Sequence, residues 1–130
     1  MPGQAATDTI WSALVLGTNS EQPKRIPQAL EPYAPMLTRV FGYNAFEVIG
    51  QHSESIANSQ AQWLLPSKHF FLRVASQRIK GSEHKLDLSL YQDKQLLVET
   101  TARLGTHSPL VIRGPLYGQG QLIILLVVVK

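Results

Sequence analysis

Eight consecutive apolar residues, Leu122–Val129, constrain the fold of this chain more than any other feature of its sequence. A helix that spans a bilayer needs about 20 apolar residues, so this run is too short to be a membrane span. Its second half is rich in β-branched side chains, which favour extended structure over helix. A strand that is apolar on both faces must be covered on both faces. The run therefore predicts a central strand that is buried on both sides.

The segment before this run, "RGPLYGQG", has the glycine content of a phosphate-binding loop. Such loops lie between a strand and a helix, because the helix N-terminus supplies the amides that hold the phosphate. Here the segment precedes a strand, and the spacing of Gly114, Gly118 and Gly120 fits neither known phosphate motif. We therefore expect a wide hairpin loop in which these glycines adopt positive φ.

The composition indicates one ordinary domain. The chain has 130 residues, 44% of them hydrophobic and 16% charged, so we expect a single domain over residues 1–130 in which residues 1–8 can be disordered. A net charge of +3 favours anions only weakly. The absence of cysteine excludes disulfides, thiolate metal sites and cysteine nucleophiles, and it is compatible with the cytoplasm or with bacterial extracytoplasmic space.

The N-terminal residues do not have the pattern of a signal peptide. There is no cationic segment, and Asp8 directly precedes an apolar run that Ser12 interrupts. We interpret this run as a strand, and we expect no signal peptide and no membrane span in this chain. The compartment is left open by the sequence.

One segment has helical periodicity. Apolar residues recur every three or four positions from Ile26 to Phe41, which predicts a helix over residues 27–41 that ends at Gly42. Pro32 and Pro35 would each remove a helical hydrogen bond. We therefore expect the helix to be kinked or to begin properly only near Pro32.

The remaining segments alternate with a period of two residues, which predicts strands. They begin near Ala45 and continue over residues 62–66 and 70–79. Residues 85–104 form the clearest hairpin, in which both strands place apolar residues on one face. That arrangement requires an odd-numbered loop, and we expect three residues. The apolar set of this hairpin is Leu86, Leu88, Leu90, Leu96, Val98, Thr100 and Ala102.

These elements predict an α+β fold. We expect two layers: a largely antiparallel sheet of about five to seven strands, with one main helix packed on one face. The helix is the obvious cover for the apolar face of the hairpin. A β-sandwich with one peripheral helix is the alternative, because the spacing of the strands also suits a sandwich.

Catalytic motifs are not evident. The histidines His52, His69, His84 and His107 have no close spacing that would place two metal ligands on one element. The carboxylates are scattered, and only Asp87 and Glu99 could meet across the hairpin, where a close pair would favour acid catalysis. We expect neither an enzyme nor a bound cofactor or metal.

Binding is the remaining class of function. Arg78, Lys80, His84 and Lys85 surround Gly81 in the most cationic stretch of the chain, so they are the candidate residues for an anion or a partner. We expect a non-catalytic module for protein interaction or assembly, in which a sheet edge pairs with a partner. The alternative is binding of an anion or nucleic acid through the hairpin tip at residues 78–85. Nucleic acid is the less favoured partner, since aromatic RNA-binding motifs are missing. Partner identity and oligomeric state are left open.

Overall fold

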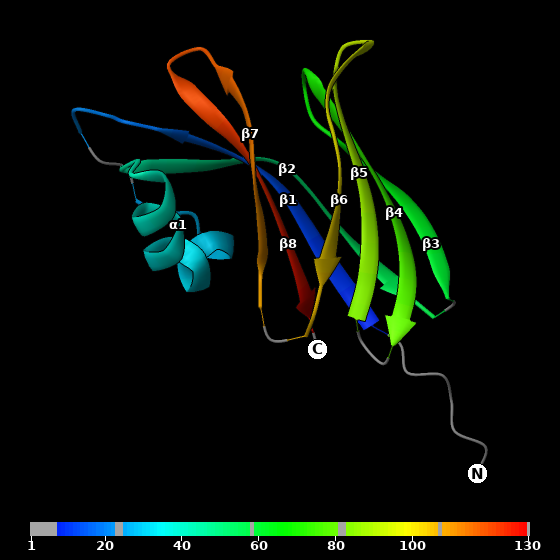
Figure 1. Cartoon of the computed structure of the whole chain (residues 1–130). Helices are drawn as coiled ribbons and strands as arrows, with labels where there is room; N and C mark the ends of the chain where they lie inside the picture. The colour runs from blue at the N-terminus through cyan, green and yellow to red at the C-terminus, as the bar shows by residue number, and fades with distance from the viewer. Residues whose placement is uncertain (1–7, 23–24, 58, 81–82, 107, 130) are drawn as a thin grey trace.

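The computed structural model describes residues 8–22, 25–57, 59–80, 83–106 and 108–129, and the side chain of Lys80 is outside this description. The described part of the chain is mostly strand, with one short helical region (Figure 1). Its elements are β1 (Asp8–Thr18), η1, a 3-10 helix (Gln28–Tyr33), α1 (Ala34–Phe41), β2 (Ala45–Ile56), β3 (Gln60–Pro66), β4 (Phe70–Lys80), β5 (Glu83–Gln92), β6 (Gln95–Leu104), β7 (Leu110–Tyr117) and β8 (Gly120–Val129).

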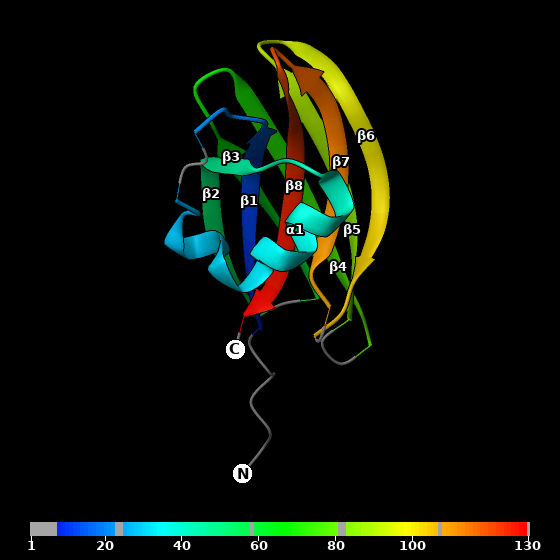
Figure 2. The same cartoon turned by 90° about the vertical axis from the view of Figure 1, so that its left-hand side faces the viewer.

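The strands form two antiparallel sheets that pack face to face. The first sheet has the order β2-β1-β8-β7, and the second sheet has the order β3-β4-β5-β6. The first and last strands, β1 and β8, are therefore neighbours in the middle of the first sheet. Helix α1 lies on the outer face of the first sheet, in front of β1 and β8 in Figure 2.

This architecture corrects the predicted fold. The α+β fold with one sheet of five to seven strands and a main helix is wrong, and the alternative, a β-sandwich with a peripheral helix, is closer. The eight residues of α1 are about 12 Å long, whereas the ten residues of β8 extend over about 33 Å. A helix of that length cannot cover the inner faces of such strands, so a second sheet covers them.

The C-terminal strand is central and buried on both faces, as its composition predicted. Strand β8 lies between β1 and β7. Leu122, Ile124 and Leu126 pack in the core between the two sheets. Ile123 and Leu125 point the other way and pack with Leu30 and Leu37 from the helical region. The first sheet is therefore the middle layer of three.

The α-helix begins just after Pro32, close to one of the two possibilities that the prolines left open. Residues 28–33 form the 3-10 helix η1, which contains Pro32, and the α-helix begins only at Ala34. Pro35 is then in the first turn, where its missing N–H removes no helical hydrogen bond. Gly42 ends the helix at φ 73°, and its N–H donates to the Thr38 carbonyl oxygen at 2.8 Å. No helix in the described part of the chain has the length and apolar character that crossing a membrane requires.

The hairpin of β5 and β6 has a shorter turn than predicted. Gln92 pairs with Gln95 across a two-residue turn in which Asp93 has φ 55°. The apolar pattern required an odd number of residues in the loop, and the extra residue is found within β6 instead. Leu90 pairs with Val98 and Tyr91 pairs with Leu96, so Leu97 has no partner on β5 and forms a bulge. The prediction of a three-residue loop is therefore wrong, although the parity argument behind it holds. The bulge places Leu96 on the outer face, where its side chain is exposed.

The glycine-rich segment also forms a tight turn and not a wide loop. Tyr117 pairs with Gly120, and among the three glycines only Gly118 has positive φ, at 59°. Gly114 lies within β7 and packs so closely against β8 that an added Cβ would be 2.9 Å from the Leu122 carbonyl oxygen. Strand β7 is irregular at this point, since two of its residues oppose one residue of β8.

Burial of β8 leads to a stability prediction. We expect Leu126→Ala to lower the free energy of unfolding by about 2–5 kcal/mol, because Leu126 is fully buried between the sheets. The matched control is Val129→Ala in the same strand, which should change it by less than about 1 kcal/mol because that side chain is partly exposed. Urea unfolding followed by circular dichroism measures both changes, and equal effects at the two positions would contradict this packing.

Candidate functional site

The four candidate contact residues predicted from the sequence lie in different environments. Arg78 and His84 are opposite each other on β4 and β5, and His84 is fully buried. Lys85 is exposed on the outer face of the second sheet. The side chain of Lys80 lies outside the described part of the structure. Arg78 and His84 therefore do not share one surface with Lys85, and anion binding at this turn stays a prediction.

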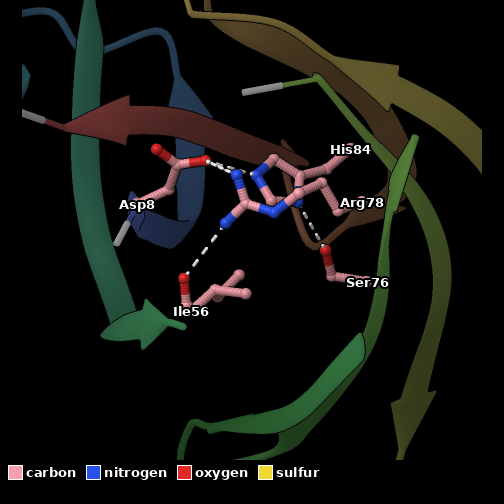
Figure 3. Close-up of polar contacts among 5 residues, drawn as sticks. All are labelled: Asp8, Ile56, Ser76, Arg78 and His84. Carbon is pink, nitrogen blue, oxygen red and sulfur yellow. Dashed lines mark hydrogen bonds and ion pairs between the residues drawn. The ribbon is translucent and has the colours of Figure 1, made fainter. Parts of the chain in front are cut away.

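Arg78 and His84 instead meet the carboxylate of Asp8, the first residue of β1 (Figure 3). His84 Nε2 lies 2.9 Å from Asp8 Oδ2, and Arg78 Nη1 lies 3.1 Å from the same oxygen. Asp8 is only 4% exposed. One carboxylate thus accepts from an imidazole and a guanidinium inside the protein. We call Asp8, Ser76, Arg78 and His84 the buried ionic cluster.

Two further hydrogen bonds connect this cluster to the surrounding strands. The ring atom His84 Nδ1 lies 3.1 Å from Ser76 Oγ, and Arg78 Nη2 donates to the Ile56 carbonyl oxygen at 3.2 Å. Because a carboxylate only accepts, His84 Nε2 carries a proton, and in the neutral ring Nδ1 accepts from the serine hydroxyl. The cluster therefore joins β1 and β2 of the first sheet to β4 and β5 of the second.

The chain Asp8–His84–Ser76 has the residue types of a hydrolase triad, so its chemistry has to be considered. A nucleophile must reach a substrate, and here the serine is only 4% exposed. The carboxylate is also shared with Arg78, which makes Asp8 part of an ion pair between the two sheets. This geometry supports a structural role, in which the cluster holds the sheets together at one end.

Sequence analysis missed this cluster because its members are far apart in the chain. Asp8 and His84 are separated by 76 positions, and Asp8 was placed in the segment that could be disordered. In the structure Asp8 belongs to β1, while residues 1–7 lie outside the described residues. A charge directly before an apolar strand was the only signal in the sequence, and it does not identify a partner.

A second candidate site lies on the outer face of the second sheet. It is a shallow groove of about 660 Å³, which we call the polar groove. The sheet pairing places its side chains in adjacent rows: Arg73, Ser89 and Glu99 in one row, and Asp87 and Thr101 in the next. The residues that line the groove are Gln62, Arg73, Ala75, Asp87, Ser89, Glu99, Thr100 and Thr101.

Asp87 and Glu99, the carboxylates considered in the sequence, share the groove but are not directly opposite. Asp87 pairs with Thr101, whose hydroxyl donates to Asp87 Oδ1 at 2.8 Å, and Glu99 pairs with Ser89. Diagonal neighbours of this kind are about 7–8 Å apart. That spacing is between backbone positions, so the register places the two carboxylates on one face of the sheet without placing them directly opposite each other.

A row of exposed and half-buried apolar side chains borders the polar groove on the same face. Pro66 pairs with Phe71, Phe71 with Tyr91, and Tyr91 with Leu96, so the row crosses all four strands. The rings of Phe71 and Tyr91 are 5.9 Å apart between centroids. Leu64, two residues from Pro66 on β3, is 49% exposed. We call these five residues the apolar row.

Metal ligands are not gathered in the described part of the chain, where no group of three or more His, Asp or Glu residues could hold an ion. Comparisons with protein families, with curated proteins and with solved structures gave no significant match. The assignment of a function therefore depends on the geometry of the two candidate sites.

The structural role of the buried ionic cluster can be tested by removing its carboxylate. We expect Asp8→Ala to lower the free energy of unfolding by about 3 kcal/mol, because Arg78 and His84 would then face each other in a buried site without the anion between them. Glu83→Ala is the control, since Glu83 and Arg103 form an exposed pair at 3.5 Å that should contribute less than about 1 kcal/mol. Urea unfolding measures both variants. An Asp8→Ala protein as stable as the Glu83→Ala protein would contradict the structural role.

Proposed function

We propose that this domain is a non-catalytic protein-interaction module, and that its partner binds the outer face of the second sheet. The observation that carries the proposal is the apolar row, whose side chains are exposed or half-buried on a face that no other element of the described chain covers. The outer face of the first sheet is covered by α1. Within the described part of the chain, the outer face of the second sheet is therefore available to a partner, and that of the first sheet is not.

The apolar row has the composition of an interface core. Aromatic residues are enriched at protein interfaces, because a large ring buries much surface at a low cost in conformational entropy. Phe71 and Tyr91 are such residues, and they contact each other at the centre of the row. Leu64 and Leu96 are each nearly half exposed. Adjacent apolar side chains that stay accessible on an uncovered face favour a binding surface.

The polar groove supplies the other part of an interface, the hydrogen-bonding groups beside an apolar core. Its side chains include a guanidinium donor, Arg73, and two carboxyl acceptors, Asp87 and Glu99. The partner that fits this face is a protein that places an apolar side chain on the apolar row and polar groups in the groove. A nucleic acid fits less well, because two carboxylates would repel its phosphates.

Substitution in the apolar row tests this proposal. We expect the double variant Leu64→Ser, Tyr91→Ser to fold normally, because both side chains are on the outer face, and to lose affinity for its partner by about tenfold or more. The wild-type chain, attached to a resin, first isolates nuclease-resistant protein partners from a lysate of the source organism. Calorimetry with the purified partner then measures the affinity of each variant.

The matched control is Leu116→Ser, which also removes an exposed leucine but lies on β7, outside the apolar row; its side chain is 76% exposed. It should bind the partner as the wild type does. Equal binding by the wild type and the double variant would refute the proposed face. Retained material that is lost with nuclease, or with Lys80→Ala and Lys85→Ala, would instead support the hairpin tip as an anion site.

A further inference from the structure

We propose that two copies of this chain pair edge to edge through β6, in antiparallel orientation and with Thr101 next to Thr101 of the second copy. Strand β6 is the last strand of the second sheet, and on its outer side no strand of the described chain continues the ladder. Its backbone groups on that side are therefore available for pairing with another strand. This inference rests on β6 and does not depend on the proposed partner face.

The other edges of the two sheets are less suited to pairing. Strand β7 contains Pro115 at an irregular point of its ladder, and β3 ends with Pro66, so each lacks a backbone donor. Strand β2 has a bulge, and its Gly50 lies so close to β3 that an added Cβ would be 2.8 Å from the Pro66 carbonyl oxygen. These features block or cover an edge.

By contrast, β6 is regular over most of its length. After the bulge at Leu97, residues 98–104 pair with β5 without interruption. This part contains no proline or glycine and carries the β-branched residues Val98, Thr100 and Thr101, which favour extended structure. A regular edge of this kind can accept a strand along its whole length.

The charges of β6 specify one register for self-pairing. With Thr101 at the centre of an antiparallel pair, Glu99 of each copy is directly opposite Arg103 of the other. Both side chains project from the outer face, because they pair with Ser89 and Lys85 on β5. Directly opposed side chains on one face have Cβ atoms about 5 Å apart, which allows an ion pair. Two such pairs would form around the two-fold axis.

Neighbouring registers lose this complementarity. Moving the centre to Thr100 or to Ala102 places a threonine opposite one charge and leaves the two charges unmatched. Glu99 and Arg103 are the only charged residues of β6, so no other match compensates. On the inner face, the central register places Val98 opposite Leu104, and both residues already belong to the core or pack against it. The charges and the apolar side chains therefore both favour the register centred on Thr101.

Both charged side chains are accessible in the single chain. Glu99 is exposed and makes no ion pair among the described residues. Arg103 lies 3.5 Å from Glu83, but both side chains are largely exposed, so this contact is weak and exchangeable. A second copy can therefore engage Glu99 and Arg103 without breaking a buried interaction.

Pairing in this register would join the two second sheets into one sheet of eight strands. The two-fold axis of an antiparallel strand pair is perpendicular to the sheet, so both outer faces lie on the same side. Thr101, which lines the polar groove, would be next to the axis. The two polar grooves would then adjoin, and the dimer would present both apolar rows to one partner surface.

Charge reversal provides the test, with analytical ultracentrifugation of the purified chain over a series of concentrations as the measurement. We expect the wild type to dimerise, and we expect Glu99→Arg and Arg103→Glu each to weaken the dimer by about tenfold or more, because like charges would then face each other twice. An equimolar mixture of the two variants should restore the wild-type affinity, since every pair in the mixed dimer is again complementary.

The matched control is Lys68→Glu, which reverses an exposed charge between β3 and β4, at the far side of the second sheet from β6, and should leave the dimer intact. Circular dichroism and urea unfolding confirm that each variant folds. A wild type that stays monomeric at all concentrations, or a dimer that both charge reversals leave unchanged, would overturn the pairing. So would a mixture that remains monomeric. Because no second protein is used, failure of the proposed partner face leaves this test unaffected.

Discussion

Burial of the first sheet on both faces is the constraint on which the rest of the structure depends. Strand β8 is apolar at every position after Gln121, so each of its faces needs a cover. The second sheet supplies one cover, and α1 with η1 supplies the other. The outer face of the second sheet is then the free broad face of the described chain. The placement of the candidate binding surface follows from the packing of one strand.

The buried ionic cluster adds directional contacts to the packing of the two sheets. The two sheets meet mostly through apolar side chains, whose contacts are not directional. One buried hydrogen bond, from Trp63 Nε1 on β3 to Ser12 Oγ on β1 at 3.1 Å, is directional. At one end of the sandwich, Asp8 is bound by side chains from β4 and β5, and Arg78 also reaches the backbone of β2. These directional bonds favour one position of the first sheet on the second. They also explain why His84 is buried and Arg78 is partly buried, although both were predicted to lie at a surface turn.

Local pattern predicted the elements better than their arrangement. The strands at Ala45, Phe70 and Leu122, and the end of the helix at Gly42, follow from periodicity and from glycine, which act over a few residues. The order of the layers does not follow from periodicity. A period of two shows that one face of a strand is buried, but it does not show which element covers that face. The sequence allowed the helix as the cover. Only the length of the α-helix, which the prolines shorten to Ala34–Phe41, favours the second sheet.

The candidate surfaces depend on still finer details. Asp87 and Glu99 were expected to share a face and do so, but register places a threonine and a serine opposite them. That register is determined by the bulge at Leu97, which no pattern of apolar residues identifies, since a bulge and a longer loop give the same parity.

The bulge at Leu97 connects the two proposed surfaces. With the extra residue in β6, Leu97 packs toward the core and Leu96 turns to the outer face beside Tyr91, where it completes the apolar row. Beyond the bulge, the remaining residues keep a regular ladder in which Glu99 and Arg103 share the outer face. Had the odd residue been in the turn, Leu96 would lie inside, and the apolar row would end at β5. One irregular position near the hairpin turn thus determines both the breadth of the partner face and where the regular edge of β6 begins.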